Sequence, residues 1–142
     1  MPTSEKFASV TVHVAVNASI EKVWEYWTST LHIPHWNFAS EDWHAPSAEN
    51  NLEVNGTFTY RMEAKDGSIG FDFEGVYTEV IPFQKIEYKL ADERKVAITF
   101  QQQETEVLVT EIFDAETENP IEMQRLGWQA ILDNFKKYVE TA

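Results

Sequence analysis

The chain has 142 residues, 43% of them hydrophobic, and a formal net charge of -13 at pH 7. This length suits one domain with one core, which we expect to span residues 1–142. The acidic charge repels phosphate backbones, so nucleic acid is a poor partner. Cysteine is absent, which excludes disulfides and a cysteine nucleophile and favours a cytoplasmic location. No apolar run predicts a signal peptide or membrane insertion.

The N-terminal part predicts one strand and two short helices. Alternating hydrophobic residues indicate a strand over residues 7–16. Ser19 offers an N-cap oxygen, and apolar residues at three- and four-residue steps from Ile20 to Trp27 predict a short amphipathic helix. A second short helix is expected near residues 31–36. Two prolines and an Asn-Asn pair interrupt the pattern, so we interpret the rest of residues 29–55 as an exposed loop.

The middle of the chain predicts an antiparallel meander. Asn55-Gly56 and Asp66-Gly67 are strong turn signals. Hydrophobic and polar residues alternate between these and later turns, which is typical of half-buried strands. The predicted strands cover residues 58–62, 71–77, 86–90, 96–100 and 107–113.

A long last helix completes the chain, with Pro120 in its first turn. Its apolar stripe is wider than one contact surface requires, which predicts that a curved sheet grips it. One face carries Met123, Leu126, Ala130, Ile131, Phe135 and Tyr138, and Trp128, Leu132 and Val139 widen it. The predicted fold class is therefore α+β. A curved antiparallel sheet of about six to seven strands wraps around the C-terminal helix, and two short helices follow the first strand.

Several segments resemble a known family. They are the run VAVNASIEKVW at residues 14–24, the later Trp36, the Gly75–Tyr77 strand that ends at Ile81-Pro82, and Gly127-Trp128. The chain resembles the family related to the C-terminal domain of the activator of the heat-shock chaperone ATPase. That family belongs to the helix-grip superfamily, which also holds START-type lipid-transfer domains, birch-pollen allergens and polyketide cyclases. The resemblance implies a cavity between the long helix and the concave sheet and carries over no catalytic residue.

The aromatic residues predict a ligand site. Five Trp, five Tyr and nine Phe exceed what a core of this size needs, so we expect some of them to line a cavity. Trp128 is the strongest candidate, because the last helix must form one wall. The predicted ligand-binding residues are Trp36, Trp43, Phe58, Tyr60, Phe71, Phe73, Tyr77, Tyr88, Phe100, Glu111, Trp128, Leu132 and Phe135. The alternative is that most of them simply fill the core.

Glu111 is the charged member of this set. It is in phase with the inward residues of the strand at 107–113, which predicts an inward carboxylate unless a bulge turns it outward. A buried Glu111 would need a partner such as Arg61 or a tyrosine hydroxyl, and its pKa would be perturbed. Asp72 and Glu74 are expected on the outer face, where Arg61 pairs with one of them.

His32, His35 and His44 raise the question of a metal site. A His-x-x-His pair with a third histidine nearby has the ligand type that zinc prefers. No carboxylate can be assigned to orient these rings, so we favour exposed loop histidines and expect neither a metal nor another cofactor. A softer alternative places His35 or His44 at the cavity mouth, against a polar head group.

The leading interpretation is a non-catalytic binding module, monomeric or dimeric, that holds a hydrophobic or amphipathic small molecule. A rival is a protein-interaction module that stimulates a chaperone ATPase in a stress response, using its acidic outer surface and the aromatic loop from Trp36 to Trp43. A cyclase or hydrolase ranks last, because it requires a convergent set such as Glu111, Tyr60 and a histidine in the cavity.

Overall fold

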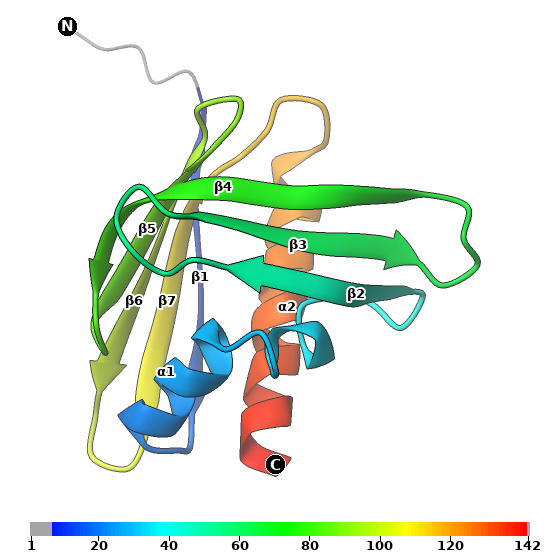
Figure 1. Ribbon diagram of the computed structural model, residues 1–142. Helices are drawn as coiled ribbons and strands as arrows, with labels where there is room; N and C mark the ends of the chain where they lie inside the picture. The colour runs from blue at the N-terminus through cyan, green and yellow to red at the C-terminus, as the bar shows by residue number, and fades with distance from the viewer. Residues whose placement is uncertain (1–6, 142) are drawn as a thin grey trace, which may run out of the picture.

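A curved antiparallel sheet and a long C-terminal helix make up residues 7–141, the part of the chain that this computed structural model describes (Figure 1). Within these residues seven strands form one sheet in the spatial order β1-β7-β6-β5-β4-β3-β2. The strands are β1 (Ser9–Val16), β2 (Trp43–Asn50), β3 (Thr57–Ala64), β4 (Gly70–Ile81), β5 (Lys85–Leu90), β6 (Lys95–Gln102) and β7 (Val107–Asp114). The helical elements are α1 (Ile20–Thr28), the single 3-10 turn η1 (Ile33–His35) and α2 (Ile121–Thr141). Among residues 7–141, no helix has both the length and the apolar character that a membrane crossing requires.

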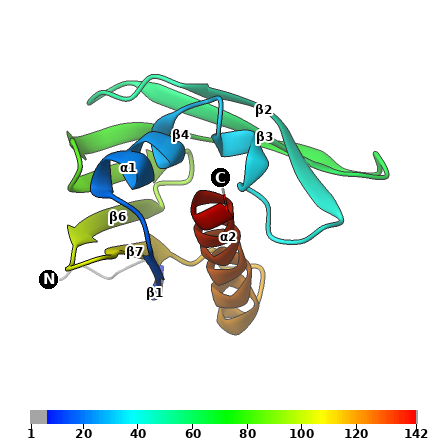
Figure 2. The same ribbon diagram turned by 90° about the horizontal axis from the view of Figure 1, so that it is seen from below.

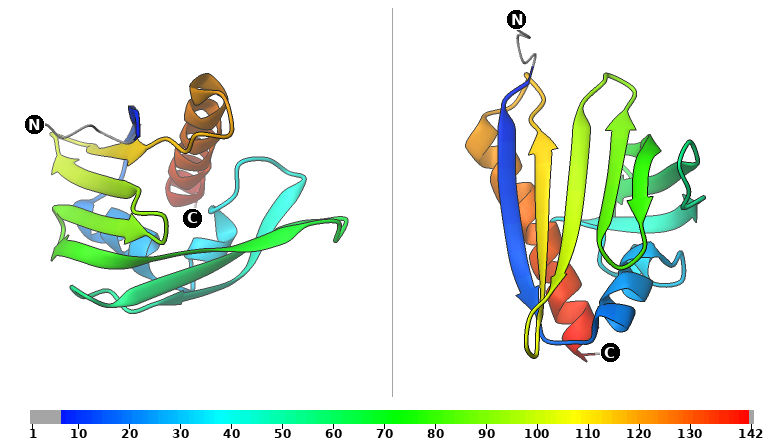
Figure 3. Two further views of the ribbon diagram at one scale, coloured as in Figure 1. Left: turned by 90° about the horizontal axis from the view of Figure 1, so that it is seen from above. Right: turned by 90° about the vertical axis from the view of Figure 1, so that its left-hand side faces the viewer.

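The sheet curls around α2, which confirms the predicted helix-grip fold. Figure 2 shows α2 nearly end-on, with β1, β7 and β6 on one side of it and β2, β3 and β4 on another. Figure 3 shows the same enclosure from above and from the side. The long strand β4 makes the bend, because residues 70–76 pair with β3 while residues 75–81 pair with β5. A register shift between Tyr77 and Glu79 adds local twist at this corner.

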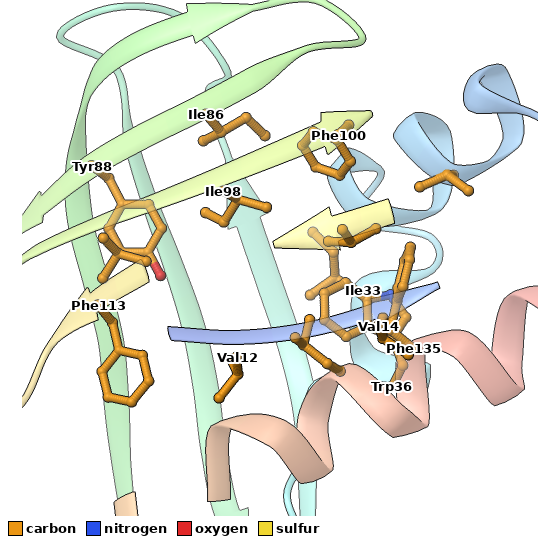
Figure 4. Close-up of a cluster of buried hydrophobic side chains, with 14 of the residues drawn as sticks. Val12, Val14, Ile33, Trp36, Ile86, Tyr88, Ile98, Phe100, Phe113 and Phe135 are labelled. Carbon is orange, nitrogen blue, oxygen red and sulfur yellow. The ribbon is translucent and has the colours of Figure 1, made fainter. Parts of the chain in front are cut away.

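The core lies between α2 and the inner faces of the strands. Figure 4 shows its side chains, with Val12 from β1, Phe113 from β7 and Phe135 from α2 among them. The buried residues of α2 are Leu132, Phe135 and Val139. Successive steps of three and four residues place these three in one row along the helix.

Part of the predicted helix face is wrong. Met123 and Leu126 were expected in the buried stripe, yet they are 58% and 57% exposed. At 100° per residue, both project from the side of α2 opposite to Leu132 and Phe135. Met123 and Leu126 are therefore apolar residues on the exposed side of the helix and do not belong to the core.

The loop predicted over residues 29–55 is also wrong in part, because residues 43–50 form the edge strand β2. Pro46 concealed this strand in the sequence. A strand at the edge of a sheet has one side without ladder partners, so it tolerates a residue that cannot donate a hydrogen bond. The register between β2 and β3 shifts between His44 and Ser47, which accommodates the proline.

In the turn before β3, the backbone of Gly56 lies very close to the backbone of Asn51. Its predecessor Asn55 has a φ of 71°, and a Cβ on Gly56 would lie 2.2 Å from the carbonyl oxygen of Asn51. We expect Gly56→Ala to lower the free energy of unfolding by about 1–3 kcal/mol, because the backbone must shift to make room. Urea denaturation followed by circular dichroism measures this change.

Gly127 provides the matched control for this prediction. It lies within α2, and a Cβ added there would meet no atom within 4 Å. Gly127→Ala should therefore raise the free energy of unfolding by up to about 1 kcal/mol, since alanine is the better helix former. A Gly56→Ala protein as stable as the wild type would contradict the close approach.

Candidate functional site

A cavity of about 310 Å³ lies between α2 and the inner face of the sheet. Its walls come from the ends of α1 and η1, from β3, β4, β5 and β7, and from the first half of α2. Eight of the thirteen predicted ligand-binding residues line it. These are Trp36, Tyr60, Phe71, Phe73, Tyr77, Tyr88, Glu111 and Trp128.

The other five predicted residues lie outside the lining. Phe58, Phe100, Leu132 and Phe135 are buried in the core, each at most 5% exposed. Phe58 supports the wall from behind, with its ring 4.9 Å from Tyr60 and 4.7 Å from Tyr88. Trp43 is half-buried on the edge strand, against the ring of Phe71.

Trp128 projects from α2 as the predicted helix wall. Its ring stacks on Phe113 of β7, with centroids 4.0 Å apart and an interplanar angle of 6°. The ring of Phe73, from β4, meets it edge-on at 6.2 Å. These two contacts hold the indole in one orientation, so one wall of the cavity is preorganised.

A chain of hydrogen bonds orders the tyrosine side of the cavity. The Tyr60 and Tyr77 hydroxyls are hydrogen-bond partners. The Tyr77 hydroxyl donates to Oδ1 of Asn50 at 2.5 Å, and Nδ2 of Asn50 donates to the carbonyl oxygen of Thr28 at 2.8 Å. Burial raises the pKa of Tyr77 to about 12 and that of Tyr60 well above its ordinary value. Both hydroxyls therefore stay protonated at neutral pH.

Glu111 faces inward, as its phase in β7 predicts. It is 5% exposed and is the buried charged residue of the core within residues 7–141. Its cross-strand neighbours are Val12 on β1 and Ile98 on β6, and Ile86 on β5 continues that row. Burial among these aliphatic groups raises the pKa of Glu111 to about 8, because the charged form loses its hydration.

The expected pairing of Glu111 with Arg61 does not occur. Arg61 lies on the outer face of β3, where its guanidinium contacts Glu63 at 2.8 Å and Asp72 at 3.4 Å. The strand alternation that turns Tyr60 and Met62 inward turns Arg61 outward. The predicted pairing of Arg61 with one of the outer carboxylates of β4 is thereby confirmed for Asp72.

Two further charged residues line the cavity, Arg94 and Glu116, and each has a partner within the protein. Nε of Arg94 contacts Asp92 at 2.7 Å. The carboxylate of Glu116 accepts hydrogen bonds from the Asn119 backbone at 2.7 Å and from Gln124 at 3.2 Å. The Asn119 bonds are the main reason that the pKa of Glu116 is lowered.

The histidines lie away from the cavity. Nδ1 of His32 is 2.8 Å from the Tyr138 hydroxyl, and the imidazole stacks on Tyr26 at 3.8 Å. The imidazole of His35 stacks on the ring of Tyr138. Nε2 of His44 lies 3.8 Å from the carboxylate of Glu63. The described part of the chain contains no group of three histidine or acidic residues arranged to hold a metal ion.

Eight lining residues were not predicted: Trp27, Asn37, Met62, Ile86, Arg94, Glu116, Gln124 and Ile131. A signal existed for four of them, and Trp27 is one of these because it lies on the apolar face of the predicted first helix. Met62 follows Tyr60 by two residues in β3, and Ile86 precedes Tyr88 by two in β5, so strand period places each on the inner face. Ile131 follows Trp128 by three residues on α2. The polar members lie in turns or at helix ends, where no period applies.

Comparison with known proteins gives the chain close structural relatives. The solution structure of an AHSA1-like protein from Aeromonas hydrophila is 40% identical, covers 94% of this chain and 93% of that one, and has a TM-score of 0.88. A protein from Cytophaga hutchinsonii is 50% identical over 94% of this chain and 92% of its own, with a TM-score of 0.82. A protein from Chromobacterium violaceum shares the fold at 21% identity, covering 93% and 96%, with a TM-score of 0.83.

No curated protein matches the chain. The family model described as activator of Hsp90 ATPase homolog 1-like protein matches residues 17–140, which include every residue that lines the cavity. That match covers well over half of the sequence, and the Aeromonas hydrophila relative, at 40% identity, is described as an AHSA1-like protein. The chain belongs to the activator of Hsp90 ATPase homolog 1-like family.

Proposed function

We propose that this protein is a binding module whose cavity holds a hydrophobic or amphipathic small molecule between α2 and the concave sheet. The cavity of about 310 Å³ carries the proposal. Protein cores are normally close-packed, so an aromatic-lined space of this size is a feature that packing alone does not produce. Its volume is at the lower end of ligand pockets, which are mostly apolar with a few placed polar groups.

The aromatic loop that the rival interpretation needs supports the ligand proposal instead. A partner surface would expose Trp36 and Trp43 as one apolar patch. Trp36 is only 3% exposed, and its indole N–H donates to the Tyr26 carbonyl oxygen at 3.0 Å. Phe38 and Trp43 are half-buried. These rings therefore do not form one exposed apolar patch, and a chaperone-directed role would rest on the acidic outer surface alone.

The composition of the cavity also favours binding over catalysis. A cyclase or hydrolase of the kind considered above needs a histidine near Glu111 and Tyr60. None of the four histidines of the chain is among the residues that line the cavity in the described structure. The acidic and phenolic groups that are present have no basic partner positioned to accept and return a proton.

A nuclear magnetic resonance titration tests the proposal directly. Labelled protein is titrated with fatty acids, sterols, flavonoids and aromatic acids while the indole N–H signals are followed. We expect saturable shifts at Trp128 and Trp36, which line the cavity. Trp24 is the internal control, because its ring packs on Phe83 and Phe100 outside the lining. Shifts equal at all indoles, or none at any concentration, would contradict the proposal.

A cavity-filling variant separates cavity binding from surface binding. Ile131 lines the cavity from α2, so Ile131→Phe should occupy part of the space and weaken binding at least about tenfold, a loss near 1.4 kcal/mol. Ile112→Phe is the matched control, because Ile112 is 44% exposed on the outer face of β7. Equal affinity for the two variants would place the ligand outside the cavity.

A further inference from the structure

The Glu111 carboxyl group is buried without a partner. No hydrogen bond or ion pair joins it to another side chain within residues 7–141, although the residue is only 5% exposed. In the same residues, every fully inaccessible side-chain nitrogen or oxygen has a hydrogen-bond partner. The carboxyl oxygens of Glu111 must therefore retain some accessible surface. Since Glu111 lines the cavity, that surface faces the cavity interior.

The neighbours of Glu111 cannot satisfy it. Figure 4 shows Val12, Ile86 and Ile98, the aliphatic row that flanks it, on the inner side of the sheet. The Glu111 charge contributes to raising the pKa of the Tyr88 hydroxyl. When this group is ionised it only accepts hydrogen bonds, and among these aliphatic neighbours a donor or a cation from a ligand would stabilise that form.

The remaining charged groups of the cavity are already committed. Arg94 is held by Asp92, and Glu116 accepts hydrogen bonds from the turn that precedes α2. Tyr60 and Tyr77 belong to the hydrogen-bond chain that ends at Asn50. Glu111 is therefore the charged group of the cavity that has no hydrogen-bond or ion-pair partner among residues 7–141.

Three observations favour a cation. The free group is a carboxyl, which binds ammonium by a charge-assisted hydrogen bond. The cavity is lined by the rings of Tyr60, Phe73, Tyr88 and Trp128, and aromatic faces attract cations. The net charge of -13 also raises the local concentration of cations and lowers that of anions.

We propose that the cavity selects aromatic ligands that carry a protonated amine, with the ammonium group on Glu111 and the aromatic body between Trp128 and the tyrosines. This inference rests on the proposed ligand-binding function and names its ligand class. A neutral or anionic aromatic molecule of the same shape binds less tightly, because it leaves the carboxyl group unpaired.

The proposal predicts that ligand binding releases protons and that affinity depends on pH. Without ligand, Glu111 has a pKa of about 8 and is mostly protonated at neutral pH. An ammonium group binds the ionised form, so binding releases close to one proton at pH 7. Amine affinity should rise more than about tenfold from pH 6 to pH 8. Over this range Tyr60, Tyr77 and Tyr88, with raised pKa values, stay neutral and Glu116, with a lowered one, stays ionised.

Isothermal titration calorimetry with three indoles of one frame tests the ligand class. Tryptamine is the cation, 3-propylindole its neutral isostere and indole-3-propionate the anion. We expect the wild-type protein to bind tryptamine at least about tenfold more tightly than either analogue at pH 8. Titrations in buffers of different ionisation enthalpy should report the released proton at pH 7.

Two variants assign the effect to Glu111. Glu111→Gln should lose both the preference for tryptamine over 3-propylindole and the proton release. Glu104→Gln removes the same charge from the exposed β6–β7 turn and should keep both. This control distinguishes contact with Glu111 from the general field of an acidic protein.

The outcomes separate the two proposals. If wild-type protein binds all three indoles equally, or prefers indole-3-propionate, the amine inference is overturned while the proposed binding function stands. If Glu111→Gln retains the tryptamine preference, the inference is likewise overturned. If neither these indoles nor the broader ligand panel bind, the proposed function fails and the inference fails with it.

Discussion

Glu111→Gln is expected to stabilise the unliganded protein, and more strongly as the pH rises. Burial raises the pKa of this carboxyl group from 4.5 to about 8, so between these values the folded state binds a proton more tightly than the unfolded state. Folding stability therefore falls as the pH rises through this window. The full loss is roughly 5 kcal/mol above pH 8, from 1.36 kcal/mol per unit of pKa. Glutamine stays neutral throughout and escapes this loss.

Urea denaturation at pH 5, 6, 7 and 8 measures the difference between the variant and the wild type. We expect the gap to widen by about 1 kcal/mol per pH unit, reaching roughly 3 kcal/mol at pH 7. Any constant cost of burying an amide cancels in this slope, as do the titrations of the histidines. Glu104→Gln, at an exposed position, should show no such slope. A gap that does not change with pH would mean that Glu111 is not held in an apolar site.

Phe135→Ala is expected to lower the free energy of unfolding by about 3–5 kcal/mol. The side chain is fully buried, and its ring meets Trp27 at 4.9 Å and Trp36 at 4.8 Å, both edge-on. These contacts join α2 to α1 and η1. Removing the ring leaves a void that rigid aromatic neighbours cannot fill, so both transfer energy and packing are lost. Chemical denaturation followed by tryptophan fluorescence measures the change.

Leu126→Ala is the matched control on the same helix. Leu126 is 57% exposed and lies on the opposite side of α2, so its truncation should change stability by no more than about 0.5 kcal/mol. Comparable losses for the two variants would contradict the assignment of the buried face. A loss below about 1 kcal/mol for Phe135→Ala would indicate that the core collapses around the missing ring.

The buried carboxyl group of Glu111 lowers the stability of the unliganded protein at neutral pH. Its row on the sheet is otherwise aliphatic, and an apolar residue there would be favourable at neutral pH. Under the proposed binding function, a ligand would supply the partner that the Glu111 carboxyl group lacks in the unliganded protein.

The strands and caps were predictable from the sequence because their signals are local. Strand alternation put Glu111 in phase with the inward residues of β7, and in the structure no bulge turns it outward. Ser19 accepts a hydrogen bond from the Lys22 backbone as the N-cap of α1. Where a local rule has an exception that depends on position in the sheet, as for Pro46 in β2, the prediction was wrong.

The order of the elements and the curved sheet around a long helix were predictable from the sequence, because periodicity and turn residues act over a few positions. The direction of Glu111, and which aromatic rings line the cavity and which fill the core, became clear only from the three-dimensional arrangement of the strands and α2. Phe58 and Tyr60 lie two residues apart on one strand face, yet only Tyr60 reaches the cavity. That difference depends on the bend at β4 and on where α2 crosses the sheet, which are long-range contacts that no local pattern encodes.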